Sequence, residues 1–69
     1  MTKKERKKIA RELAKYEIVI QHAHDETAKR YAEEQSMKLA LKITNFEDME
    51  AIDELVPQMI QDIIENGPN

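Results

Sequence analysis

The sequence predicts an all-α protein in which a long N-terminal helix, continuous, kinked or broken near residues 22–26, carries a shorter C-terminal helix packed back on it. Glycine and proline are confined to positions 57, 67 and 68, so nothing earlier forces the chain to turn. The body is rich in Ala, Glu, Lys, Arg, Leu and Met, which are good helix formers. Apolar residues recur at helical spacing near both ends. We therefore expect residues 1–69 to form a single helical domain.

Residues 1–24 are predicted to form a basic amphipathic helix. Four residues at spacings of 4, 3 and 4 share its apolar face: Ile9, Leu13, Tyr16 and Ile20. Five basic residues share the opposite face: Lys4, Lys7, Lys8, Arg11 and Lys15. Thr2 and Glu5 have the spacing of a capping box, in which two backbone N–H groups are satisfied reciprocally. That pair marks the start of the helix.

The segment from Tyr16 to Ile20 is apolar around the whole helix. Ile18 projects toward the basic face and Val19 toward its flank. A helical segment that is apolar on all sides needs burial from more than one direction. This segment is therefore a candidate oligomer contact, the alternative being one or two exposed aliphatic side chains of the kind that monomers tolerate.

Residues 25–44 form either a second helix or a continuation of the first. The apolar stripe resumes one position out of register, at Ala28, Ala32, Gln35 and Leu39. Because no helix breaker intervenes, we favour a helix that is continuous or merely kinked to Ile43; it would span about 60 Å and need a second chain to cover it. The alternation over Met37–Thr44 also suits a strand, but no comparable second strand exists to pair with it.

Residues 45–66 are predicted to form an acidic helix. Thr44 or Asn45 can cap it, and acidic residues fill its first turn, where the helix dipole favours carboxylates. Its apolar seam comprises Met49, Ile52, Val56, Met59 and Ile63, widened by Leu55, Ile60 and Ile64. Pro57 lacks an N–H and crowds the preceding turn, so we expect a kink or break near Leu55–Pro57. Gly67 followed by Pro68 is a good stop signal.

Charge is strongly segregated along the chain. Residues 1–15 carry a net charge of +5, residues 16–44 carry −1 and residues 45–69 carry −7. This pattern suits complementarity within the chain or between subunits. If the chain reverses at Thr44–Asn45, the last helix would lie along residues 24–43, and an antiparallel dimer would bring the partner's acidic helix near the basic segment. Exposed ion pairs contribute little energy, so the charges would set orientation and the apolar seams would drive association.

The segregated charge could also serve a different kind of partner. The lysines and Arg11 of the basic face could neutralise phosphates of a nucleic acid, although the pI of about 5.3 argues against a nucleic-acid-binding domain. Alternatively, the acidic helix could dock on a basic protein surface through Glu50, Asp53 and Glu54. Membrane binding is not expected, because the basic helix lacks Trp and Phe and the acidic end would be repelled by anionic lipid.

The small size of the chain favours self-assembly. Below roughly 70–80 residues a lone core seldom supplies more than about 3–5 kcal/mol without disulfides, metal or oligomerisation. Cysteine is absent, so no disulfide can compensate. We therefore predict a homo-oligomer, with a dimer favoured. The residues predicted to form its interface are Ile9, Leu13, Tyr16, Ile18, Ile20, Val56, Ile60 and Ile63.

The residues needed for catalysis or cofactor binding are missing. The single serine, Ser36, lacks the glycine elbow of a nucleophile, and one glycine cannot build a phosphate loop. On a continuous helix, His22 and Glu26 could share a metal ion, but two ligands are too few for a structural site. The sequence therefore predicts a protein that is not an enzyme and has no cofactor or metal site.

The opening Thr2-Lys3-Lys4-Glu5-Arg6-Lys7-Lys8, the Ala/Glu/Lys-rich body and the length resemble short helical proteins encoded by phages and prophages of Gram-positive bacteria. That resemblance implies no particular activity and assigns no functional residue. The residues themselves favour a helical protein–protein interaction module. No apolar run is long enough to cross a membrane and no secretory signal is evident, so a cytoplasmic location is expected.

Overall fold

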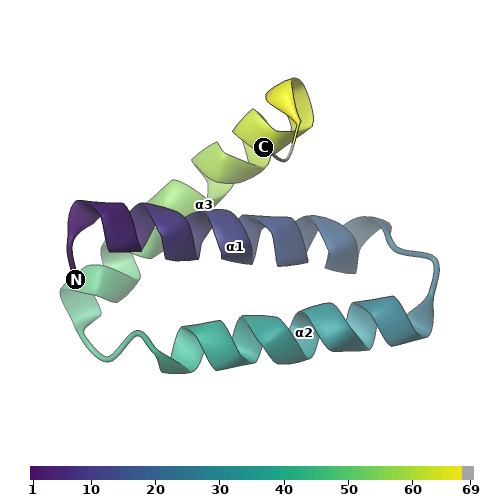
Figure 1. Cartoon of the computed structure of the whole chain (residues 1–69), viewed down its shortest axis with the longest axis horizontal. Helices are drawn as coiled ribbons and strands as arrows, with labels where there is room; N and C mark the ends of the chain where they lie inside the picture. The colour runs from purple at the N-terminus through teal and green to yellow at the C-terminus, as the bar shows by residue number, and fades with distance from the viewer. Residues whose placement is uncertain (68–69) are drawn as a thin grey trace.

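The computed structural model describes residues 1–67, and within that range it is all-helical. Helix α1 spans Lys3–His22, α2 spans Glu26–Leu41 and α3 spans Phe46–Asn66 (Figure 1). The all-α class is confirmed, and residues 37–41 of the segment with strand-like alternation belong to α2. Pro68, expected to help stop the last helix, lies outside the described residues.

Helix α1 begins where its capping box predicts. Thr2 Oγ1 accepts a hydrogen bond from the Glu5 N–H at 3.1 Å, and the Glu5 carboxylate accepts one from the Thr2 N–H at 3.4 Å. Two N–H groups that have no partner within the helix are thereby satisfied.

The favoured continuous helix through residues 22–26 is wrong, because the chain breaks there and reverses. Ala23 is extended, with φ −70° and ψ 137°, and Asp25 Oδ1 accepts a hydrogen bond from the Thr27 N–H at 3.0 Å to cap α2. The described chain measures 34 × 26 × 16 Å, which excludes a 60 Å helix. The physical reason is burial: the hairpin lets the stripe of α2 cover the apolar face of α1 within one chain.

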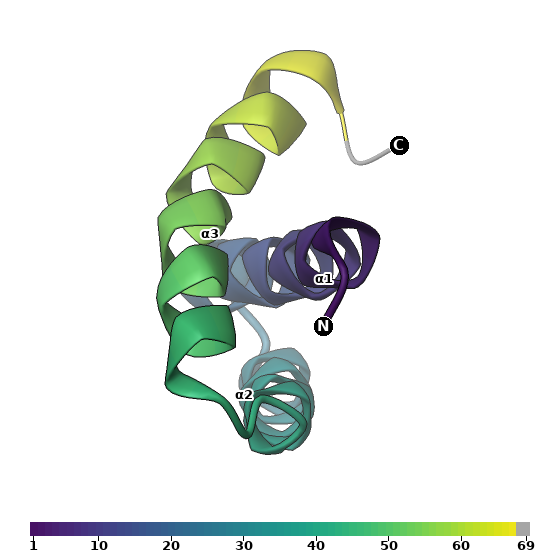
Figure 2. The ribbon, with the colours of Figure 1, turned by 90° about the vertical axis from the view of Figure 1, so that its left-hand side faces the viewer.

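Helix α3 begins after Asn45, whose side-chain Oδ1 accepts a hydrogen bond from the Glu47 N–H at 2.7 Å. Of the two candidate caps, Asn45 is therefore the one used. The sequence predicts a kink or a break near Pro57. Helix α3 continues through this residue without a break, and Figure 2 shows it bowed. It ends at Gly67, whose φ of 87° is one that side-chain-bearing residues rarely adopt.

Helix α1 is the centre of the fold, and α2 and α3 both pack on it. Figure 2 shows α1 almost end-on, with α2 beside it and α3 crossing one flank. The expectation that the last helix would run back along residues 24–43 is therefore wrong, because α3 covers α1 instead. Ala10 and Ala14 on α1 and Ile52 on α3 are completely buried. Two alanines on successive turns let a neighbouring helix approach α1 closely.

Candidate functional site

Two ion pairs hold the acidic helix α3 on the basic helix α1. Arg6 Nε donates a hydrogen bond to Asp48 Oδ1 at 2.8 Å, and Asp48 is only 6% exposed. Farther along, Arg11 Nη1 lies 3.2 Å from Asp62 Oδ2. The opposite charges of the two ends of the chain thus meet, in part, within one molecule.

These contacts shift two carboxyl groups. The hydrogen bond from Arg6 lowers the pKa of Asp48 below its ordinary value, with help from the nearby positive charge of the Met1 amino group. Hydrogen bonds from Asn66 and then Arg11 lower the pKa of Asp62. Both shifts favour the ionised form because a positive charge or an N–H donor faces each carboxylate.

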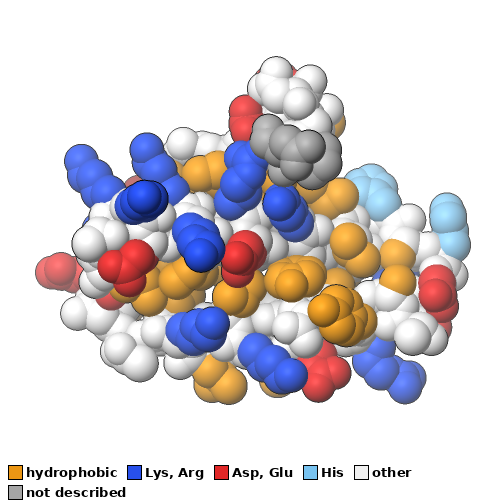
Figure 3. Space-filling model, in the orientation of Figure 1, with side chains coloured by type: hydrophobic (Ala, Val, Ile, Leu, Met, Phe, Trp, Pro, Cys, Tyr) orange, Lys and Arg blue, Asp and Glu red, His pale blue; other side chains and the backbone are white. Residues whose placement is uncertain are grey.

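The predicted basic face is only partly available to a partner. Arg11 is half-buried and engaged by Asp62. The four lysines of that face are exposed and make no ion pair with any of residues 1–67: Lys4, Lys7, Lys8 and Lys15. In Figure 3, Lys and Arg side chains are spread over the face of the hairpin that α3 does not cover. The molecule therefore has a basic front and an acidic helix behind it.

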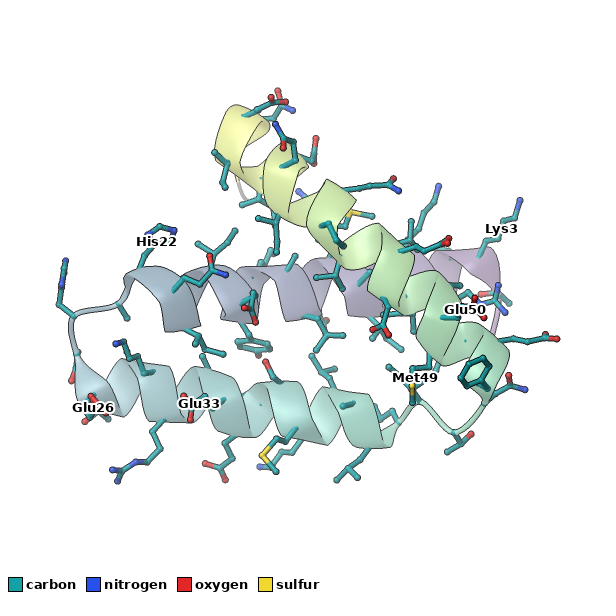
Figure 4. The ribbon with its side chains drawn as sticks, turned by 180° about the vertical axis from the view of Figure 1, so that it is seen from behind. Lys3, His22, Glu26, Glu33, Met49 and Glu50 are labelled. Carbon is teal, nitrogen blue, oxygen red and sulfur yellow. The ribbon has the colours of Figure 1, made fainter. Side chains whose placement is uncertain are left out.

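A groove lies between α2 and α3, on the face opposite that basic front (Figure 4). It has a volume of about 480 Å³ and opens to solvent. Its apolar lining comes from all three helices: Leu13 of α1, Met37 and Ala40 of α2, and Val56 and Pro57 of α3. Met37 is 68% exposed, so one wall presents a large apolar side chain to solvent.

The charged part of the lining is entirely acidic, and Ser36 adds a neutral hydroxyl group. The charged part consists of two carboxylates, those of Glu17 of α1 and Asp53 of α3. Glu17 accepts a hydrogen bond from Gln21 at 3.2 Å, and neither carboxylate is ion-paired within residues 1–67. Glu33 and Glu50 also project from the two helices that flank the groove, as Figure 4 shows. The apolar hollow is thus bordered by negative charge.

The groove arises because α2 and α3 diverge. Both helices pack on α1, but within residues 1–67 the backbones of α2 and α3 do not come close to each other. The connection of residues 42–45 holds their near ends together, and Figure 4 shows them separating from there. A strip of α1 around Leu13 and Glu17 is left between them without a helix on top.

The residues predicted for an oligomer interface are divided among several places. Leu13 and Val56 line the groove between α2 and α3. Ile18 and Ile63 line a second hollow, of about 390 Å³, together with Lys15 and Val19. The remaining four, Ile9, Tyr16, Ile20 and Ile60, are half-buried within the chain. Ile18, which the helical wheel placed on the basic face, thus lies beside Ile63 of α3 instead of being left bare.

The acidic residues predicted to face a partner lie together on the solvent side of α3. Glu50, Asp53 and Glu54 are all exposed. Only Asp53 belongs to the groove, and Glu50 lies nearer the start of the helix (Figure 4). Of the three predicted acidic residues, Asp53 is therefore the one that lines the apolar groove between α2 and α3.

The two histidines lie at the reversal of the chain. His22 ends α1 and Glu26 begins α2, so the one-turn spacing on a shared helix that would let them bind one metal ion does not exist. Figure 4 shows the side chains of His22 and Glu26 on different helices, well apart. Over residues 1–67, no three His, Cys, Asp or Glu side chains cluster so as to hold a metal ion. In that same range, no helix is long and apolar enough to span a bilayer.

Two features of this surface are not predicted from the sequence. Met37, Ser36 and Ala40 are absent from the predicted site residues, because the pattern of residues 25–44 favours a stripe that a second chain would cover. Asp48 is predicted only to interact with the helix dipole. A signal for its burial exists: Asp48 precedes Ile52 by one turn and so shares the apolar face of α3, where a carboxylate needs a partner.

Comparison with known proteins returns no relative: no protein-family model, no curated protein and no solved structure matches this chain.

Proposed function

We propose that this protein is a non-enzymatic helical interaction module that binds a protein partner through the groove between α2 and α3. The observation that carries this proposal is an apolar hollow, open to solvent, with contributions from every helix. Interface energy is concentrated where a large apolar side chain of one partner fills such a hollow on the other. Covering the lining would remove apolar surface from water, which favours association.

Self-association is one form that this binding can take. Completely buried side chains are few: in residues 1–67, Ile52 is the only large one. Outside the groove, four large apolar residues are more than half exposed: Tyr31, Leu41, Phe46 and Ile64. So small a core is the situation in which association adds needed stability. The solution mass, measured by sedimentation equilibrium over a range of concentrations, tells a second copy from a different partner.

The groove itself is tested by selection from a displayed library of random helical peptides. The matched variants are Met37→Glu, which places a charge on the groove wall, and Leu41→Glu, on the same helix but outside the lining. Both side chains are largely exposed, at 68% and 79%, so both variants should fold, and circular dichroism checks that they do. We expect the enriched peptides to bind the wild type and the Leu41→Glu variant but not the Met37→Glu variant. Peptides that bind all three proteins equally would refute the groove as the site.

A second candidate function is nucleic-acid binding by the four exposed lysines of the basic face of α1. Its test is binding of a DNA duplex at rising salt concentration, because phosphate contacts release counterions and weaken steeply with salt. Reversing Lys4, Lys8 and Lys15 to Glu should abolish such binding. Arg11 is left unchanged in this test, since its contact with Asp62 would confuse lost binding with lost packing. Salt-independent binding, or binding that survives the reversal, would exclude this function.

A further inference from the structure

We infer that the partner seated in the groove is a basic amphipathic helix of another protein, with an apolar side chain inserted between α2 and α3 and Lys or Arg residues set against Glu17 and Asp53. This inference rests on the proposed function, since it names the class of partner for the same groove. It is supported by the shape of the groove, by the charges along it and by the poor fit of a second copy of this chain to the same groove.

The shape fits a helix. Helices α2 and α3 flank α1 without their backbones coming close to each other, which leaves a place for a further element between them. The lining extends over residues 36–40 of α2 and 53–57 of α3. Each of these stretches is about one helical turn, or roughly 6 Å. The hollow therefore has room for one apolar anchor, while the rest of the incoming helix lies along the flanking walls.

The charges select a basic helix. Glu17 and Asp53 lie in the lining, which contains neither Lys nor Arg. Helix α3 has no basic residue anywhere, so one whole wall is acidic or neutral. On α2, Lys38 follows the lining residue Met37 directly but lies 3.9 Å from Glu34, with which it forms an ion pair. An incoming carboxylate would meet like charge here, whereas an ammonium or guanidinium group would meet two unpaired carboxylates.

A second copy of this chain fits the same groove poorly. In a symmetric dimer the same patch faces itself, which would set the Glu17 and Asp53 carboxylates of one copy against those of the other. The segment that projects beyond the hairpin is the end of α3 (Figure 1); it carries Glu65, and Asp62, one turn earlier, is paired with Arg11 of α1. Inserting that end into a neighbour's groove would bring acidic residues to an acidic border. A head-to-tail contact of this kind also forms open chains unless its rotation closes a ring.

The test uses two synthetic helical peptides with one shared apolar seam, one flanked by Lys and the other by Glu. Fluorescence anisotropy measures their affinity for the whole protein at low and at high salt. We expect the Lys-flanked peptide to bind at least about tenfold more tightly at low salt, with the difference shrinking at high salt as screening increases. Asp53→Lys should remove most of that preference. Glu54→Lys, an equal charge reversal at an exposed residue outside the lining, should leave most of it.

The outcomes separate this inference from the proposed function. If both peptides bind equally and both are lost in Met37→Glu, the groove binds proteins but does not select basic helices, and this inference falls alone. If neither peptide binding nor solution mass responds to Met37→Glu, both the inference and the proposed function fall. A concentration-dependent mass that Met37→Glu abolishes would identify a second copy as the occupant, which overturns the inference and keeps the groove.

Discussion

Arg6 and Asp48, 42 residues apart in sequence, meet with Arg6 Nε donating to Asp48 Oδ1 at 2.8 Å. The contact joins the first turns of α1 and α3, so it ties the start of α3 to the start of α1. The carboxylate is almost buried, and removing its cation would leave a charge without compensation. This pair, with Arg11 and Asp62, converts the charge segregation of the sequence into a defined packing of α3.

Replacing Asp48 with Asn should lower the thermal unfolding midpoint by several degrees. The change removes the charge that Arg6 faces while keeping the shape of the side chain. Differential scanning calorimetry at neutral pH measures the effect. The matched control is Asp53→Asn on the same helix, which removes an exposed carboxylate without an ion pair and should leave the midpoint almost unchanged. Equal effects of the two variants would show that the Arg6 contact does not stabilise the fold.

Acidification should destabilise the protein as the pH falls below about 4. The pKa values of Asp48 and Asp62 are lowered in the folded state, so in this range the unfolded chain binds more protons and the free energy of unfolding falls with pH. Above the unfolded-state pKa the stabilisation is fully present. Urea unfolding at a series of pH values from 7 to 3 measures the free energy of unfolding. The difference in this free energy between the wild type and the Asp48→Asn variant should shrink toward pH 3. A difference that stays constant with pH would show that the ionised Asp48 is not the source of the stabilisation.

Truncating Ile52 to Ala should reduce the free energy of unfolding by about 2–5 kcal/mol, because a completely buried side chain leaves a cavity when shortened. Ile64 lies on the same helix but is 66% exposed, so the same truncation there should change stability by less than about 0.5 kcal/mol. Urea unfolding of the two variants makes the comparison. Similar losses at both positions would mean that α3 packs on α1 by a different face.

Changing Asn45 to Ala should cost about 1 kcal/mol of stability, the usual effect of removing an N-cap. The Glu47 N–H would lose its acceptor at the start of α3. The neighbouring Thr44→Ala provides the control, since Thr44 is exposed and is not the cap residue. Chemical unfolding of both variants decides between the two residues, and a larger loss from Thr44→Ala would move the start of the helix.

Substituting Pro57 by Ala should stabilise α3, by about 1–3 kcal/mol. Proline at this position cannot donate a hydrogen bond within a helix that nevertheless continues past it, and its ring is exposed. Alanine would restore the missing donor and relieve crowding in the preceding turn. Thermal unfolding measures the change, with Gln58→Ala as a nearby exposed control that should have little effect. A loss of stability on removing Pro57 would show that the bow of α3 is needed for its packing.

Local features of the chain could be predicted from the sequence, and they follow from interactions within one or two turns. The capping box of Thr2 and Glu5 and the apolar seam through Ile52 depend on residues three or four positions apart. The same local reasoning placed Asp53 among solvent-facing acidic residues. It could not place Met37 and Asp53 in one groove, because a groove is made by segments that are distant in sequence.

The sequence by itself determined the helical class, the cap of the first helix at Thr2, the start of the last helix near Asn45, and the opposite charges of the two ends. Only the tertiary structure decided that the chain breaks at residues 23–25, that α3 crosses α1 and not α2, and that Arg6 meets Asp48. No glycine or proline marks the break at residues 23–25 in the sequence. The break forms because the hairpin covers apolar surface that a straight helix would leave in water, and such burial depends on all three helices at once.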